Sequence, residues 1–172
     1  MASYRGALEK LFVVEDAPAW CPNLRCKTPV RTSGTRYFVD PSVATASLGL
    51  GPGALMSDLK SFGFLFETMA VRDLRVYAEA LGGTLSHYRD AAGLECDAVI
   101  HLRDGAYGLA EIKLGGDALV EEGARTLGAF ARKIDTVAMK EPSFRLLVTA
   151  VGEFAYRRKD GVFVCPLSAL RP

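Results

Sequence analysis

The sequence predicts an α/β fold in which a mixed sheet packs against helices, and three features favour this class. Apolar residues recur at intervals of three or four along two long stretches, as one face of a helix requires. Between these stretches lie three runs of strand character separated by turn signals. A short, almost wholly apolar run follows the second stretch, as expected of a strand covered on both sides. The predicted order is helix, three strands, helix, strand, strand.

The composition is that of one globular domain. Of the 172 residues, 49% are apolar and 24% are charged, which excludes a disordered tail. The formal net charge of +1 argues against a wholly electrostatic grip on nucleic acid but leaves room for a local basic groove. There is no apolar window of about 18 residues and no signal-peptide pattern. Four cysteines without a Cys-x-x-Cys pair, and only two histidines, make a structural zinc site improbable. Cys96 and Cys165 lie in apolar segments, where buried free thiols are expected, and this indicates a reducing, cytoplasmic location.

Residues 1–56 are expected to wrap around the core, because prolines and glycines interrupt every periodic piece. Three short elements are predicted there: a helix over 7–14, a strand over 35–39 and a helix over 41–48. Asp40 should cap the last of these, with Pro41 at its first position. Trp20 is expected to plug the edge of the core.

Residues 57–172 are expected to form the core. The predicted elements are a helix over 57–81, strands over 84–88, 94–102 and 107–114, a helix from 117 whose apolar face runs to 137, and strands over 144–151 and 162–165. Turn signals at 90–93 and at Asp104-Gly105 predict that the first three strands form an antiparallel meander.

Charged residues interrupt two of these apolar strands. Glu111 and Lys113 are two apart on one strand, so they point the same way, and Asp97 lies on the strand before. A two-residue loop at 104–105 would turn Asp97 away from both, whereas a three-residue loop at 104–106 would set it opposite Lys113. A bulge would also change the face. We predict the three-residue loop.

Glu67 supplies a fourth charge, on the first long helix, where its neighbours three and four residues away are glycine, alanine, phenylalanine and valine. If this helix packs across the sheet, three carboxylates and one ammonium group meet. Such a group suits a magnesium or manganese ion, which clamps a phosphate and activates a water that the lysine positions. The alternative is structural: Glu111 and Lys113 pair on a wet strand face, and Glu67 pairs with an arginine.

Two other groups of residues were weighed as site candidates. His87, beside Tyr88 on a strand, is expected to be hydrogen-bonded and structural instead of a general base. Arg157, Arg158 and Lys159 precede the last strand and are expected to form a solvated hairpin tip instead of a phosphate contact.

The four-charge pattern resembles the PD-(D/E)xK phosphodiesterase superfamily, the fold of many restriction endonucleases. By this resemblance Asp97 matches the strand aspartate, and Glu111 and Lys113 match the acidic-x-lysine doublet. Glu67 matches the helix glutamate of many members, while Cys96 stands where a proline is common. The resemblance implies a restriction-endonuclease-like core that hydrolyses DNA with Mg²⁺ or Mn²⁺. In it Asp97 and Glu111 would be catalytic metal ligands, Glu67 an auxiliary ligand, and Lys113 the residue that orients the attacking water.

A second resemblance covers most of the chain. The segments 36–41, 63–67, 88–90, 93–97, 111–113 and 161–167 are similar to an uncharacterised bacterial and archaeal domain that follows an AAA-type ATPase module. This implies an ATPase partner and a second hypothesis, in which the fold is a non-catalytic regulatory module that binds a partner protein or nucleic acid. The chain itself has no Gly-x-x-x-x-Gly-Lys-Ser/Thr loop, so ATP hydrolysis is not expected of it.

Overall fold

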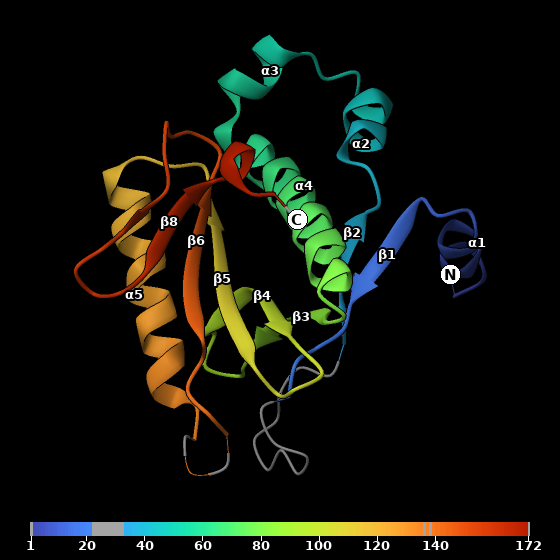
Figure 1. Cartoon of the computed structure of the whole chain (residues 1–172). Helices are drawn as coiled ribbons and strands as arrows, with labels where there is room; N and C mark the ends of the chain where they lie inside the picture. Colours follow the sequence, from blue (N-terminus) through green and yellow to red (C-terminus); the bar gives the residue numbers. More distant parts are fainter. Residues whose placement is uncertain (1, 22–32, 136, 138, 172) are drawn as a thin grey trace.

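A computed structural model describes residues 2–21, 33–135, 137 and 139–171 of the chain. The described strands form a six-stranded mixed sheet, in the order β3-β4-β5-β6-β8-β7, and a separate two-stranded sheet of β1 and β2. Helices surround both sheets (Figure 1). The mixed α/β class predicted from the sequence is therefore confirmed.

The core helices and strands occur in the predicted order. The core elements are α4 (Leu59–Ala80), β3 (Thr84–Arg89), β4 (Glu95–His101), β5 (Tyr107–Lys113), α5 (Asp117–Lys133), β6 (Phe144–Thr149), β7 (Tyr156–Arg157), β8 (Phe163–Pro166) and a 3-10 turn, Leu167–Ala169. The N-terminal elements are α1 (Ala2–Lys10), β1 (Val14–Ala17), β2 (Thr35–Phe38), α2 (Pro41–Leu48) and α3 (Pro52–Ser57). As predicted, Asp40 caps α2 by accepting a hydrogen bond from the Ser42 N–H.

Strands β3, β4 and β5 form the predicted antiparallel meander. After β5 the chain crosses through α5 to β6, which pairs parallel with β5, and β8 then pairs parallel with β6. The edge strand β7 was not predicted, because two residues carry no periodicity.

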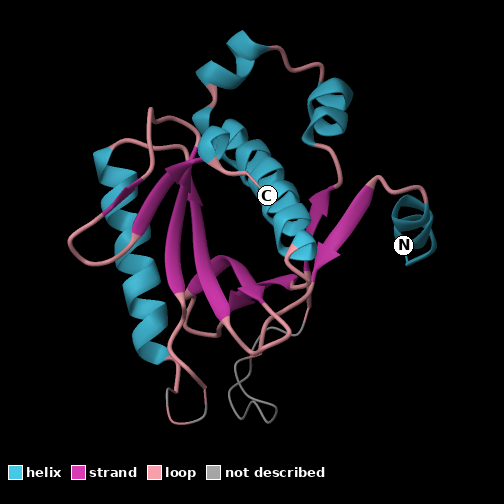
Figure 2. Cartoon of the chain, viewed as in Figure 1, coloured by secondary structure: helices cyan, strands magenta, loops and turns pink. Residues whose placement is uncertain are grey.

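The two long helices cover opposite faces of the sheet (Figure 2). Alternate residues of a strand point to opposite faces, and the packing follows this rule. On β5, Leu109 joins the cluster beneath α5 and Ala110 joins the cluster beneath α4. On β6, Leu147 likewise joins the cluster beneath α5 and Val148 the cluster beneath α4. This strand is therefore covered on both sides, as predicted.

Two predicted helix boundaries are wrong. The helix predicted over 7–14 ends at Lys10, because Phe12 has a left-handed φ of 55° and Val14 starts β1 by pairing with Phe38. The apolar periodicity to Val137 also outruns α5, because Ile134 takes an extended conformation and stops the helix. In both places tertiary pairing or a local backbone turn overrides an apolar pattern.

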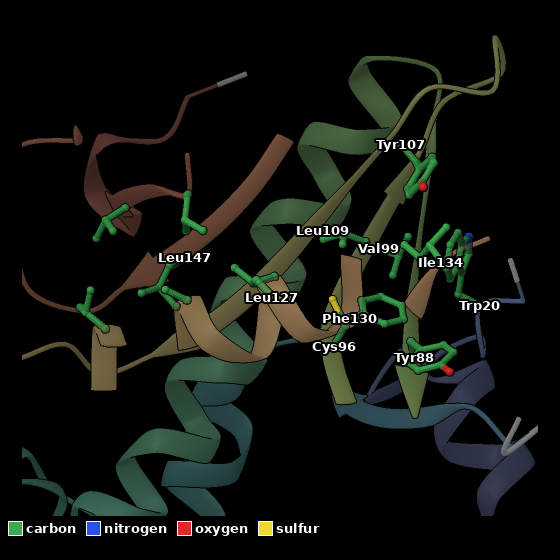
Figure 3. Packing of buried hydrophobic residues seen from close by; sticks show 14 residues of the cluster. Trp20, Tyr88, Cys96, Val99, Tyr107, Leu109, Leu127, Phe130, Ile134 and Leu147 are labelled. Atoms are coloured by element: carbon green, nitrogen blue, oxygen red, sulfur yellow. The ribbon is translucent and has the colours of Figure 1, made fainter. Parts of the chain in front are cut away.

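The N-terminal segment contributes to the core. Trp20 is buried and lies beside Tyr88 and Phe130, whose rings stack with centroids 4.3 Å apart (Figure 3). The Trp20 ring meets the Phe130 ring edge-on at 6.0 Å. The prediction that Trp20 plugs the core edge is confirmed, and the segment before the first long helix is held to the sheet by it.

We expect Trp20→Ala to lower the free energy of unfolding by about 3 kcal/mol, because it leaves a cavity among aromatic rings. Urea denaturation followed by circular dichroism measures the change. Phe154→Ala is the matched control, since Phe154 is 67% exposed and its loss leaves no cavity. Equal stabilities of the two variants would contradict this account of the core edge.

The cysteines divide into two kinds. Cys96 and Cys165 are buried and free, as predicted, whereas Cys21 is disulfide-bonded. Cysteine usage therefore does not indicate a single redox compartment, and the cytoplasmic location remains an expectation. Within the part of the chain that the structure describes, no helix has the length and apolar character needed to cross a membrane.

Candidate functional site

The candidate site lies where β4 and β5 separate. Their ladder ends at the pair Ala98 and Ala110. Beyond that pair, the Asp97 carboxylate lies between the strands and accepts a hydrogen bond of 2.8 Å from the Ile112 N–H. Ile112 is the residue between Glu111 and Lys113, so all three predicted strand residues lie where β4 and β5 separate. We call this place the fork.

The predicted pairing of Asp97 with Lys113 is wrong. The loop has three residues, as predicted, but it spans 103–105, because the Leu102 N–H donates to the Ala106 carbonyl at 2.8 Å. A three-residue hairpin loop favours a left-handed conformation at its last position, and Gly105 has a φ of 83° there. The pairing of β4 with β5 is therefore shifted relative to the predicted pairing. If the ladder continued one residue beyond Ala98, Asp97 would lie opposite Glu111.

A β-bulge in β4 changes the direction of the Asp97 side chain. On β3, Ser86 pairs with Val99 and Tyr88 pairs with Cys96, so one residue of β3 faces two of β4. The Cys96 sulfur lies 3.4 Å from the carbonyl oxygens of both Ala98 and Ala110, which share its single S–H proton. These contacts hold the bulge at the same point where the β4–β5 ladder opens.

Tyr37 of the N-terminal strand β2 is a site residue that sequence reasoning missed. Its hydroxyl donates a 2.9 Å hydrogen bond to Oε1 of Glu67 on α4. The alternative that Glu67 pairs with an arginine is thus wrong, because its hydrogen-bond partner is a phenol. The available signal was weak: Tyr37 lies in a predicted strand, but nothing in the sequence indicates that this strand reaches α4.

The three carboxyl groups of the site are buried, and they resist ionisation. Burial and the neighbouring Asp97 raise the pKa of Glu67 to about 7 and that of Glu111 to about 8. Burial also raises the pKa of Asp97, although the hydrogen bond from the Ile112 N–H acts to lower it.

Lys113 is the cation of the group. Its Nζ lies 3.3 Å from Oε2 of Glu111. Burial acts to lower the pKa of Lys113, but the carboxylates of Glu111 and Asp97 outweigh it and hold the pKa above its usual value. Lys113 thus remains charged, and one ammonium faces three carboxyl groups.

Only two of the four charges border the adjacent cavity. A cavity of about 510 Å³ is lined by Glu67 and Asp97, whereas Glu111 and Lys113 are not part of its wall. Glu111 is only 2% exposed. The four residues are therefore electrostatic neighbours at one fork, but they do not line a single hollow.

The predicted three-carboxylate ligand set is not formed. Among the described residues, no three His, Cys, Asp or Glu side chains are arranged to hold a metal ion. The reason is that Asp97 is engaged by the β5 backbone and Glu111 by Lys113. Magnesium in proteins usually keeps several waters and needs only one or two carboxylates plus substrate phosphate. The donor set fits that kind of site and not an all-protein cage.

The other sequence candidates have structural partners. His87 is buried, and its Nε2 lies 3.3 Å from the Ser33 carbonyl, consistent with the structural role expected. At the hairpin tip Arg157 and Lys159 are exposed, as predicted, whereas Arg158 is only 18% exposed and forms ion pairs with Glu121 and Asp160. Arg157 lies over the Phe163 ring. These groups therefore stabilise the fold around β7 and β8.

Comparison with known proteins identifies one related family. The model of a family described as "Domain of unknown function (DUF4143)" matches residues 62–170. This span includes the fork, Glu67 and all strands of the six-stranded sheet, but it leaves out Tyr37. No curated protein and no solved structure matches the chain.

Proposed function

The chain belongs to the DUF4143 family, and from its site we propose that the protein hydrolyses phosphodiester bonds in DNA with a divalent metal ion. One observation carries the proposal. Glu67, Asp97 and Glu111 come from three different elements and lie close together in the interior where β4 and β5 separate, and Asp97 raises the pKa of both glutamates. Titratable groups whose pKa values are shifted by burial and by specific charged neighbours are typical of functional sites.

The chemistry assigns a role to each side chain. Asp97 and Glu111 would hold a magnesium or manganese ion, whose other ligands would be waters and the substrate phosphate. When bound, such an ion polarises the phosphoryl oxygen and lowers the pKa of bound water. Lys113 donates hydrogen bonds, so it orients the attacking water and stabilises negative charge that develops on the phosphate. Tyr37 holds Glu67 in place through its hydroxyl.

Cleavage of plasmid or oligonucleotide DNA tests the proposal. We expect cleavage with Mg²⁺ or Mn²⁺, none with EDTA, and a loss of about 100-fold in Lys113→Ala. Lys10→Ala is the control, since Lys10 is exposed on the distant helix α1. The absence of metal-dependent cleavage by the wild type would refute the proposal, as would equal cleavage by the two lysine variants.

A second candidate function has an observation in its favour. Asp97 and Glu111 each already have a protein partner, and a ligand set of three is absent from the described residues. This favours a module that binds DNA or an AAA-type ATPase without turnover. Calorimetry with magnesium and with DNA separates the two functions. DNA binding that is indifferent to metal, together with no cleavage, would favour the module.

A further inference from the structure

The cavity beside Glu67 and Asp97 has the size and position of a binding site. Its volume of about 510 Å³ falls within the range of about 300–1,000 Å³ that is typical of ligand pockets. One wall comes from β2 and α2, which precede the family-matched region, and the other walls come from α4, β3 and β4. The N-terminal segment therefore completes a hollow that the core alone leaves open.

Part of the cavity wall consists of exposed apolar side chains. Phe64 on α4 is 61% exposed, and Leu48 at the end of α2 is 68% exposed, although both side chains line the hollow. Phe38 of β2 is a further aromatic residue in the wall. Exposed aromatic and aliphatic side chains around a hollow suit a flat, apolar-faced ligand, because stacking removes both surfaces from water.

Three carboxyl side chains, those of Glu67, Asp97 and Glu95, also line the cavity. The two arginines of the wall have carboxylate partners: Arg89 contacts Glu95 at 2.8 Å, and Arg36 contacts Asp16 at 3.0 Å. A free phosphate is repelled by these carboxyl groups, whereas amino groups are attracted to them. Carboxylates are the groups that accept hydrogen bonds from the exocyclic amine of cytosine.

We propose that this cavity binds an unpaired nucleobase with an exocyclic amino group, stacked on Phe64 and hydrogen-bonded to the carboxylates. The inference deepens the proposed function and rests on it, because the same Asp97 lies at the fork and in the cavity wall. The substrate is then single-stranded DNA, or DNA with an extruded base next to the cleaved bond. A fully paired duplex binds less well, since unpairing and unstacking a base costs free energy.

Fluorescence anisotropy in EDTA tests the inference without metal or turnover. We expect a labelled oligodeoxycytidine to bind about 10-fold more tightly than oligothymidine of equal length and than a fully paired duplex. Phe64→Ala should weaken oligodeoxycytidine binding about 10-fold, within the range of about 1–3 kcal/mol for loss of one stacking partner. Phe154→Ala, which removes an equally exposed phenylalanine outside the cavity, should leave it unchanged.

Each other outcome counts against the inference. No detectable binding, equal affinity for the two oligonucleotides, or equal effects of the two phenylalanine variants would overturn it. Circular dichroism should show that both variants fold, because both side chains are exposed. A wild type that binds oligodeoxycytidine through Phe64 yet cleaves nothing with magnesium would refute the proposed hydrolysis and leave the base-binding cavity intact.

Discussion

Replacing Glu111 with glutamine is expected to lower metal-dependent DNA cleavage about 1,000-fold. A metal ion contributes several kcal/mol to stabilising a phosphoryl transition state, and each 1.36 kcal/mol corresponds to a factor of ten in rate. Glutamine keeps the shape of the side chain but cannot give up a proton to become the anionic ligand that would hold the ion. Measurement of initial cleavage rates at saturating Mg²⁺ gives the ratio.

The variant should keep its fold, which makes the result interpretable. Because the pKa of Glu111 is about 8, the buried site already accommodates a neutral acid at pH 7, and glutamine has nearly the same shape. Glu121→Gln is the matched control, since that side chain is 70% exposed and pairs with Arg158 on the surface. Wild-type cleavage by Glu111→Gln would remove this residue from the proposed mechanism.

Periodicity explains which parts of the fold could be predicted. The two long helices and the antiparallel meander follow from spacings that persist over many residues. Along β5, Glu111 and Lys113 could be placed on one face because strand alternation needs no knowledge of neighbours. The ends of α1 and α5 could not be predicted, because the backbone conformation of one residue, Phe12 or Ile134, determines each of them.

The geometry around Asp97 depends on features that leave little trace in the sequence. Its placement results from a bulge held by the Cys96 thiol and from a loop whose last residue, Gly105, takes a left-handed conformation. A glycine in a turn signal is compatible with hairpin loops of several lengths, so the sequence did not determine how β4 pairs with β5. The contact between Tyr37 and Glu67 joins segments 30 positions apart, which periodicity within one element does not address.

The pH dependence of stability provides a second large effect, and its sign follows from the raised pKa values of the carboxyl groups. In the folded protein Glu67 and Glu111 keep their protons up to about pH 7 and 8, whereas in the unfolded chain both lose them near pH 4.5. Between these values the folded state binds more protons, so the free energy of unfolding falls as pH rises. The stabilisation is complete below about pH 4.5 and is lost above about pH 8. His87 acts in the opposite direction, because burial lowers its pKa.

Comparison with Glu111→Gln measures the contribution of Glu111 together with its coupling to Glu67, since His87 is the same in both proteins. In EDTA the wild type should lose about 4 kcal/mol relative to the variant between pH 5 and pH 9, at 1.36 kcal/mol for each unit of pKa shift. Urea denaturation at several pH values measures the difference between the two profiles. Parallel profiles would mean that Glu111 ionises normally in the folded protein. The fork would then lack the uncompensated negative charge that makes a divalent cation its natural ligand.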